Sequence, residues 1–240
     1  MRHISKMLGI VMGFGAATVA SASIDVDGFT WDYAYTGDAL PTASSPAWTT
    51  GGGGSASVLG GVLTIDTTTT DGKFFEIARG GDYNPTTVSG EKAYIQFRAK
   101  VNSEVDGIRF ATQIYVGGQA GTIALNLGNF GGNTGVFDNA SNFLVNVDLS
   151  QWHTYRVELD ANAPSYRLWI DDFNTSVASG TGFGTGGSMY FGDGSGDTQG
   201  NVDFDYIAWT NTGAPVAVPE PAALSLVMLG AAIIARRRRT

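Results

Sequence analysis

Short runs of alternating apolar and polar residues fill the chain between residues 23 and 213. Gly, Asn, Asp, Ser and Thr separate them and helix-forming stretches are scarce, so the pattern predicts β-strands throughout this segment. The two glycines Gly60-Gly61, between Val58-Leu59 and Val62–Ile65, predict a tight hairpin. Further strands are expected at 74–78, 93–101, 107–116, 122–127, 135–138, 143–149, 152–160, 165–171, 188–191 and 202–210.

The strands at 152–160 and 165–171 have the clearest faces. In the first, Tyr155, Val157 and Leu159 share one side, and in the second Leu168 and Ile170 do so. Strands with one apolar and one polar side pack as two layers. We therefore expect an all-β fold, a β-sandwich of two antiparallel sheets formed by one domain over residues 23–213.

Residues 1–22 have a different pattern, which predicts a processing segment. They begin with Arg2 and Lys6, continue with an apolar stretch, and end in Ala20-Ser21-Ala22. The fourteen residues from Met7 to Ala20 are too few to cross a hydrocarbon layer of about 30 Å. We expect a cleaved signal peptide, with Ala20 and Ala22 as the small residues that the peptidase recognises.

Residues 214–240 form a tail with three parts. Pro219-Glu220-Pro221 comes first, then an apolar run that can form a helix, and then Arg236, Arg237, Arg238 and Arg239. The prolines prevent an earlier helix start, and the arginines hold the helix end at a negatively charged cytoplasmic leaflet. At about 1.5 Å per residue, a helix over Ala222–Ala235 spans a bilayer only marginally. A plain C-terminal membrane anchor is one interpretation.

The same order of parts resembles the PEP-CTERM sorting signal of Gram-negative bacteria that make exopolysaccharide. The resemblance implies recognition by a membrane-embedded processing enzyme, an exosortase, and only transient membrane association through the hydrophobic helix. It also implies that the body of the protein is delivered to the cell surface or the extracellular matrix.

Charge and composition exclude several other functions. Between Ser23 and Val218 there are eight Lys and Arg against twenty-one Asp and Glu, a net charge of −13, compared with −8 for the whole chain. Such a surface repels nucleic acid and anionic lipid and suits cations. This segment has no cysteine and one histidine, His153, which excludes disulfides and a multi-histidine zinc site.

Two stretches of the body carry a second resemblance. They are Gln151–Leu159 with Tyr166–Asp171, and the closing run Tyr190–Gly196 with Val202–Trp209. These residues are similar to the concanavalin A-like lectin/glucanase superfamily, in particular its laminin-G-like bacterial members. The resemblance implies a jelly-roll form of the β-sandwich but little about function, because this fold carries lectins, glycan hydrolases and adhesive modules.

Glucanases of that superfamily carry Glu-x-Asp-x-Glu or Glu-x-Asp-x-x-Glu on a strand, where a period of two puts the carboxylates on one face. Glu158-Leu159-Asp160 and Glu104-Val105-Asp106 both lack the second Glu. Asp203 and Asp205 alternate on the closing strand, outside such a motif. We therefore expect a protein that is not an enzyme.

Many members of the superfamily hold a structural calcium ion between an Asp of the closing strand and an acidic residue near the start. Asp205 matches the closing-strand position, and Asp32 and Asp38 are the candidates near the start. Carboxylate oxygens on an acidic protein suit Ca²⁺. The alternative is that Asp205 caps a turn or accepts backbone amides.

Sugar rings stack on exposed aromatic side chains. Trp169 alternates away from the apolar side of its strand, and Trp48, Tyr83 and Tyr115 are further candidates. In the alternative, Trp169 packs beneath a loop. The sequence thus predicts an exported, non-catalytic surface or matrix protein that binds extracellular polysaccharide or lies within it. A ligand-free structural matrix protein and a polysaccharide-active glycoside hydrolase stay open as alternatives.

Overall fold

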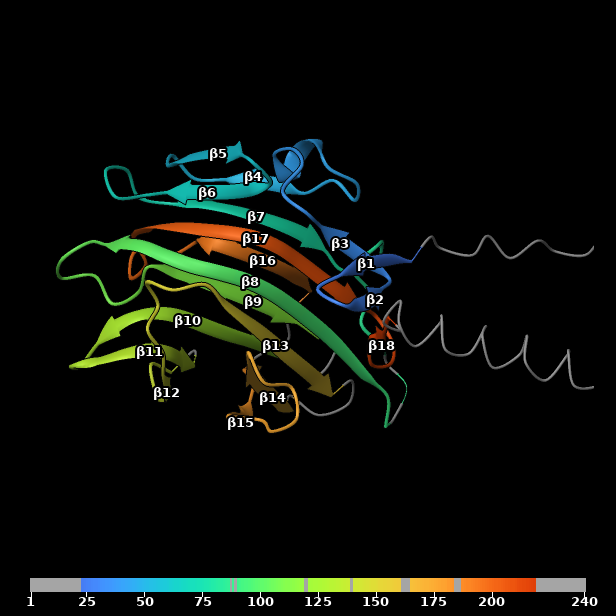
Figure 1. Ribbon diagram of the computed structural model, residues 1–240. Helices are drawn as coiled ribbons and strands as arrows, with labels where there is room; N and C mark the ends of the chain where they lie inside the picture. The colour runs from blue at the N-terminus through green and yellow to red at the C-terminus, as the bar shows by residue number, and fades with distance from the viewer. Residues whose placement is uncertain are drawn as a thin grey trace, which may run out of the picture.

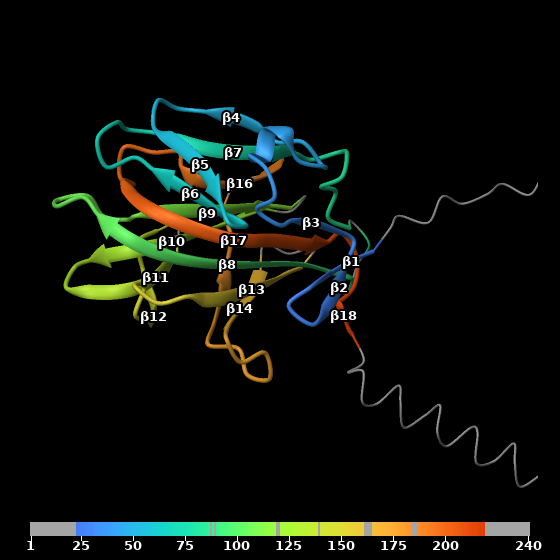
Figure 2. The same ribbon diagram turned by 45° about the horizontal axis from the view of Figure 1, so that its top comes forward.

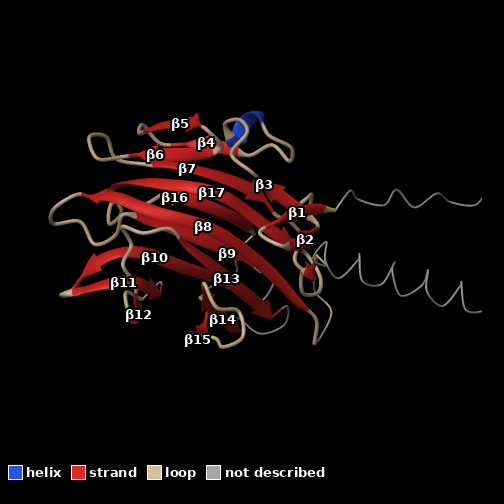
Figure 3. Cartoon of the chain, viewed as in Figure 1, coloured by secondary structure: helices blue, strands red, loops and turns tan. Residues whose placement is uncertain are grey.

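The computed structural model describes residues 23–218 except 87, 89, 119–120, 139, 161–164 and 184–186. These residues form eighteen β-strands and one short 3₁₀ helix, η1 (Pro41–Ala43). The strands build two stacked layers, and neighbouring strands pair antiparallel (Figures 1 and 3). The predicted all-β sandwich is confirmed.

The first layer is a sheet of seven strands. Its order is β12 (Phe143–Asn146), β11 (Asn133–Asp138), β10 (Thr122–Phe130), β9 (Thr112–Gly117), β16 (Ser188–Asp193), β7 (Lys73–Ala78) and β4 (Thr49–Gly51). The second layer has eight strands. Its order is β15 (Ala178–Thr181), β14 (Ser165–Ile170), β13 (His153–Asp160), β8 (Lys92–Glu104), β17 (Gly200–Thr210), β6 (Val62–Asp66) and β5 (Ser55–Leu59), with β3 (Tyr33–Tyr35) also paired to β17.

A third, small sheet joins the two ends of the described chain. It consists of β1 (Ile24–Val26), β2 (Phe29–Trp31) and β18 (Val216–Ala217), with β2 in the middle. It lies at one end of the sandwich, where Trp31 packs with Tyr206 and Ala208 of β17 on the outer side of the eight-stranded sheet (Figure 2).

The core lies between the two large sheets and is built from every second residue of their strands. In β8, Ile95 and Phe97 are fully buried, and the Phe97 ring stacks on Tyr155 of β13 with ring centroids 4.9 Å apart. Val116 of β9 and Leu125 of β10 fill the core from the other layer. The period of two in the sequence therefore sets which side of each strand faces the core.

Several expected elements have the predicted pairing. β13 and β14 are neighbours, with Leu159 opposite Tyr166. Gly60 and Gly61 have φ angles of 61° and 83°, which suit the two-residue turn of the β5–β6 hairpin.

Some predicted boundaries differ from the structure. Residues 107–111 precede β9 instead of belonging to it, because the backbone of Arg109–Ala111 crosses over Gly128 of β10. The body also extends past residue 213, since β18 pairs with β2. Among the described residues, no helix is long and apolar enough to cross a membrane.

Candidate functional site

The outer side of the eight-stranded sheet is covered by paired charges. Asp203 lies 3.3 Å from the Lys100 ammonium and accepts the Thr64 hydroxyl at 2.7 Å. Asp205 pairs with Arg98 at 2.6 Å. The neighbouring pairs are Glu158 with the Tyr94 hydroxyl at 2.7 Å and Asp160 with Lys92. Each of these carboxylates is therefore bonded to at least one partner within the protein.

The outer side of the seven-stranded sheet has a different chemistry. Tyr115 of β9 and Tyr190 of β16 stack with ring centroids 4.2 Å apart and planes 17° apart. Phe74 of β7 extends the row, 5.8 Å from the Tyr190 ring, and Phe183 meets Tyr115 edge-on at 5.9 Å. We call the outward side chains of this region the aromatic face: Phe74, Glu76, Gln113, Tyr115, Asn126 and Tyr190.

Strand register explains why these side chains meet. Tyr190 lies opposite Tyr115 on one side and opposite Glu76 on the other. Gln113 and Asn126 are likewise opposite each other, on β9 and β10. Directly opposite residues in antiparallel strands have Cβ atoms about 5 Å apart, so the pairing alone creates a continuous row.

Polar groups accompany the aromatic rings. The Tyr190 hydroxyl donates to Gln113 Oε1 at 3.3 Å, and Asn126 Nδ2 donates to the Asp138 carbonyl at 2.8 Å. Asn126 is 2 % exposed, and its Oδ1 has no hydrogen-bond partner among the described residues. A buried acceptor without a partner costs stability.

Burial affects the protonation of the Tyr190 hydroxyl on this face. Burial raises the pKa of this hydroxyl above its ordinary value of 10.0, with further contributions from Tyr115, Asp193 and Glu76. The hydroxyl therefore keeps its proton at neutral pH and stays a hydrogen-bond donor.

A cluster of phenylalanines borders the aromatic face on the β10–β12 side. Phe137 contacts Phe110 and Phe143, with ring centroids 5.4 Å apart in both pairs, and Phe130 lies 6.1 Å from Phe110. Gly128 makes this possible, because a Cβ there would lie 2.5 Å from the Phe110 Cα. The packed rings form an apolar border to the aromatic face.

The residues predicted for sugar stacking lie in three different places. Tyr115 is half-buried on the aromatic face and remains a prediction. Trp169 is half-buried on the opposite side of the molecule, beside Arg156 of β13. Trp48 was predicted wrongly: it is 3 % exposed and packs on Phe191 and Trp209 in the core, because no strand alternation governs its position.

Tyr83 is also excluded as a sugar platform. It is 1 % exposed, and its hydroxyl donates to the Gly117 carbonyl at 2.8 Å. Sequence reasoning had no signal for Tyr190, Gln113 or Asn126 as a group, since only the register of three strands brings them together.

The three calcium candidates each have a protein partner. Asp205 is ion-paired with Arg98, Asp32 accepts the Asn211 amide at 3.0 Å, and Asp38 accepts the Thr36 hydroxyl at 2.7 Å. Among the described residues, no three acidic or histidine side chains are grouped to hold a metal ion. Calcium stays a prediction: bound Ca²⁺ must raise the melting temperature, and a value unchanged by EDTA would count against it.

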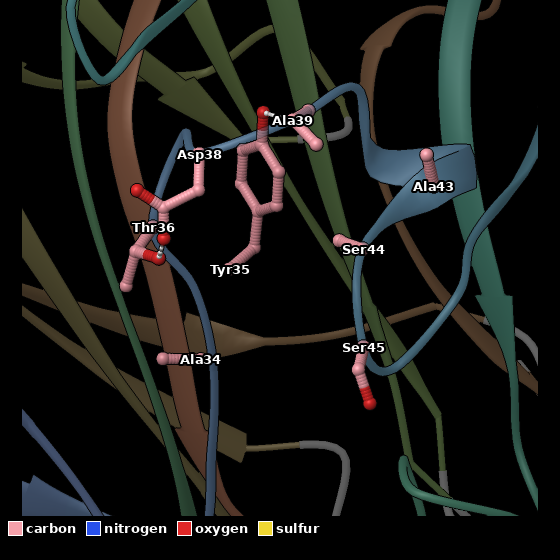
Figure 4. Close-up of a pocket in the computed structure, with 8 residues that line it drawn as sticks. All are labelled: Ala34, Tyr35, Thr36, Asp38, Ala39, Ala43, Ser44 and Ser45. Carbon is pink, nitrogen blue, oxygen red and sulfur yellow. Dashed lines mark hydrogen bonds between the residues drawn. The ribbon is translucent and has the colours of Figure 1, made fainter.

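Asp38 lines a small pocket of about 200 Å³. Figure 4 shows Asp38 and Tyr35 on one side and Ser44 and Ser45 on the other. The Tyr35 hydroxyl donates to the Ala39 carbonyl at 2.8 Å, and Ser44 Oγ lies within hydrogen-bond distance of two backbone carbonyls. The pocket holds one carboxylate and mostly satisfied hydroxyls.

His153, the histidine that a Ser-His-Asp site would need, has a structural environment. Its Nδ1 lies 2.7 Å from Asp171 Oδ2, and its Nε2 lies 3.0 Å from the Asp148 carbonyl. Both ring nitrogens therefore face acceptors instead of a hydroxyl that the ring could activate.

The residues predicted to direct export and sorting lie outside the described residues. They are Ala20 and Ala22 of the signal segment and Pro219, Glu220, Pro221 and Arg236–Arg239 of the tail. A family model described as "PEP-CTERM protein-sorting motif" matches residues 217–239. The chain carries a PEP-CTERM sorting motif. Such a motif indicates an exported surface protein that an exosortase processes.

Solved structures resemble the body in fold. An endo-1,3-β-glucanase from Streptomyces sioyaensis superposes with a TM-score of 0.52 at 15 % identity, covering 79 % of this chain and 98 % of that chain. Lectin I-B4 from Griffonia simplicifolia gives 0.47 at 9 % identity, covering 76 % and 100 %. At these identities the likeness shows the fold alone, a two-sheet sandwich shared with the glucanase. No curated protein matches the sequence.

Proposed function

We propose that this PEP-CTERM protein is a non-catalytic polysaccharide-binding protein of the cell surface or extracellular matrix, and that it binds through the aromatic face. The observation that carries the proposal is the stacked pair Tyr115–Tyr190, which is partly exposed and has Glu76 opposite Tyr190 on the same side of the sheet. The exposed parts of such rings offer apolar contact to the C–H groups of sugars, and polar side chains beside them bond the sugar hydroxyls.

The polar groups on this face favour hydroxyl-rich ligands. The partly exposed Glu76 carboxylate accepts hydrogen bonds, while the Tyr190 hydroxyl can donate or accept. A sugar hydroxyl both donates and accepts, so it matches either kind of group. Lys and Arg are missing from the outward positions that strand register assigns to β4, β7, β9, β10 and β16, which gives an anionic group no partner there.

A single carboxylate on this face supports a non-catalytic role. Glu76 is the one Asp or Glu that register assigns outward on these same described strands. Retaining and inverting glycosidases use two carboxyl groups, about 5 Å or about 6.5–9.5 Å apart. With Glu76 alone, the face can hold a glycan but lacks the pair that hydrolyses it.

The experiment compares two variants of the aromatic face with one of the opposite side. The processed protein is run in native gels that contain a soluble β-1,3-glucan or the host's exopolysaccharide, and its retardation gives an affinity. Tyr115→Ala and Tyr190→Ala should each weaken binding by about tenfold or more. Trp169→Ala is the matched control and should bind like the wild type. Binding lost only in Trp169→Ala would overturn the proposal, and no binding at all would favour a ligand-free structural protein.

One observation keeps a glycoside hydrolase as the second candidate. Asp193 ends the strand that carries Tyr190, and burial raises the pKa of its carboxyl, as in a general acid. Its environment is structural, however: it is 1 % exposed and accepts the Gly72 amide at 3.1 Å. Release of reducing sugar from the glucan, abolished in Asp193→Asn or Glu76→Gln, would establish the hydrolase and contradict the non-catalytic proposal.

A further inference from the structure

The sorting motif begins inside a strand of the folded body. The matched segment starts at residue 217, and Ala217 is the second residue of β18. In the small sheet, Val216 lies opposite Thr30 and Ala217 opposite Phe29, both on β2. The root of the motif is therefore hydrogen-bonded to the body.

The last described residue is bonded to the turn between β1 and β2. Val218 donates its amide to the Gly28 carbonyl at 2.9 Å, at the point where β2 meets the turn to β1. Asp27 and Gly28 both have positive φ angles, 52° and 78°, as a two-residue type I′ turn requires. The partner strand β2 reverses direction at this turn, and Pro219, the next residue in the sequence, has no N–H to donate.

This turn is fixed to the eight-stranded sheet. The Asp27 carboxylate accepts the Tyr206 hydroxyl at 2.8 Å, and the same hydroxyl accepts from Gln96 Nε2 at 2.7 Å. Gln96 Oε1 in turn accepts from Arg156 Nε at 2.8 Å. These bonds are largely shielded from water, so they hold the turn in one position relative to the body.

Aromatic packing attaches the receiving strand as well. The Arg156 guanidinium lies 4.1 Å from the Phe29 ring centroid and 3.8 Å from that of Phe173. Trp31, the last residue of β2, is 1 % exposed. The strand that receives β18 therefore cannot move away from the body without breaking a buried cation–π contact.

The start of the described chain meets the same sheet. β1 begins at Ile24, two residues after the predicted signal site at Ala22, and pairs with the other edge of β2. The small sheet covers the outer side of the eight-stranded sheet, whereas the aromatic face is on the outer side of the other sheet. The small sheet thus lies on the side of the sandwich away from the aromatic face.

We propose that the small sheet is a tail clamp, which holds the root of the sorting motif on β2 throughout processing by the membrane-embedded exosortase. The chain that leads to Pro219-Glu220-Pro221 would then leave the body at Val218, which is bonded to the Asp27–Gly28 turn. β18 then stays in the body after the tail is removed. The proposal goes beyond polysaccharide binding and stands or falls independently of it.

The test locks β18 to β2 with a disulfide in the full chain. The chain has no cysteine, so Thr30→Cys with Val216→Cys creates one possible bridge. Opposed residues in a hydrogen-bonded antiparallel pair have Cα atoms about 5.5 Å apart, which suits a disulfide. The double variant and both single variants are expressed in a host with the sorting machinery. Mass spectrometry then reports the bridge and the mature C-terminus.

The clamp predicts that the bridge forms and that the bridged chain is processed to the same C-terminus, and to the same extent, as the single-cysteine controls. A bridged chain that stays unprocessed while the controls are processed would show that β18 must leave β2, and would overturn the clamp. Failure of the bridge to form in a folded double variant would overturn it too.

Hydrogen exchange on the wild-type full chain keeps the test decisive if the double variant does not fold. The Val218 amide should exchange about tenfold or more slowly than in an unstructured chain, because it is bonded to Gly28. Unprotected exchange at Val218 would contradict the clamp, while a failure of glycan binding would leave this result unchanged.

Discussion

Two tryptophans show how burial separates structural from binding residues. Trp48 meets Phe191 and Trp209 edge-on in the core, with ring centroids 5.1 and 5.7 Å away. Trp48→Ala should lower the free energy of unfolding by about 3–5 kcal/mol, as for other large core truncations. Trp169→Ala, on a half-buried outer side chain, should cost clearly less. Urea unfolding of both variants measures this, and equal losses would contradict the placement of Trp48 in the core.

Asp193 predicts a pH dependence of stability. Burial raises the pKa of its carboxyl from the ordinary value of 3.8, although amide bonds from Gly72 and Ser195 oppose the shift. Such a group stabilises the fold fully below its unfolded pKa, and the contribution is lost as pH rises through the folded pKa. The Asp193→Asn variant does not ionise at this position, so it does not lose this stability as the pH rises. Its stability relative to wild type should therefore improve between about pH 3 and pH 7.

Urea midpoints of wild type and Asp193→Asn over that pH range provide the measurement. Groups other than Asp193 contribute to both proteins and cancel in the difference. A difference that stays constant with pH, or that changes in favour of wild type on raising the pH, would show that burial does not govern this carboxyl.

Some residue roles were readable from the sequence and others were not. The alternation of Tyr155, Val157 and Leu159 identified core positions, because a strand side is fixed by a period of two. Trp48 lies one residue before β4, where no period applies, so its burial depends on tertiary packing alone. The aromatic face depends in the same way on the mutual register of β9, β10 and β16.

At the level of elements, Gly128 tests how the aromatic face gets its border. A Cβ at this position would lie 2.5 Å from the Phe110 Cα and 2.7 Å from the Arg109 carbonyl oxygen, both backbone atoms. Gly128→Ala should therefore push the segment before β9 away and destabilise the protein by about 1–3 kcal/mol. Gly81→Ala is the matched control, since its Cβ would meet nothing within 4 Å. Thermal melts compare the Gly128→Ala and Gly81→Ala variants. Equal melting temperatures would contradict the close approach of the Arg109–Ala111 backbone to Gly128.

The small sheet is the element that the sequence could not reveal. Its strands have three, three and two residues, which is too short for a visible hydrophobic period. Phe29 and Ala217 are paired although almost the whole body lies between them in the sequence. Pairing between residues so far apart leaves no local pattern in the sequence. The Asp27-Gly28 dipeptide was a usable turn signal, because both residues tolerate the positive φ that they have.

At the level of the molecule, the charge distribution predicts which polysaccharides bind. The body carries eight Lys and Arg against twenty-one Asp and Glu, and several of those cations are paired on the side away from the aromatic face. A neutral glucan should bind with little dependence on salt. An anionic polysaccharide should bind more weakly, and added salt should improve its binding by screening the repulsion. Tighter binding of the anionic polymer at low salt would contradict this prediction.

The central claim is that one side of the sandwich binds glycan while the other side holds the sorting motif. Hydrogen exchange of the processed protein, with and without saturating polysaccharide, tests it most directly because it maps the contact strand by strand. The account predicts slower exchange in β9, β10 and β16, around Tyr115 and Tyr190, with the small sheet unchanged. Protection confined to β13, β14 and β17, or no change anywhere, would contradict it.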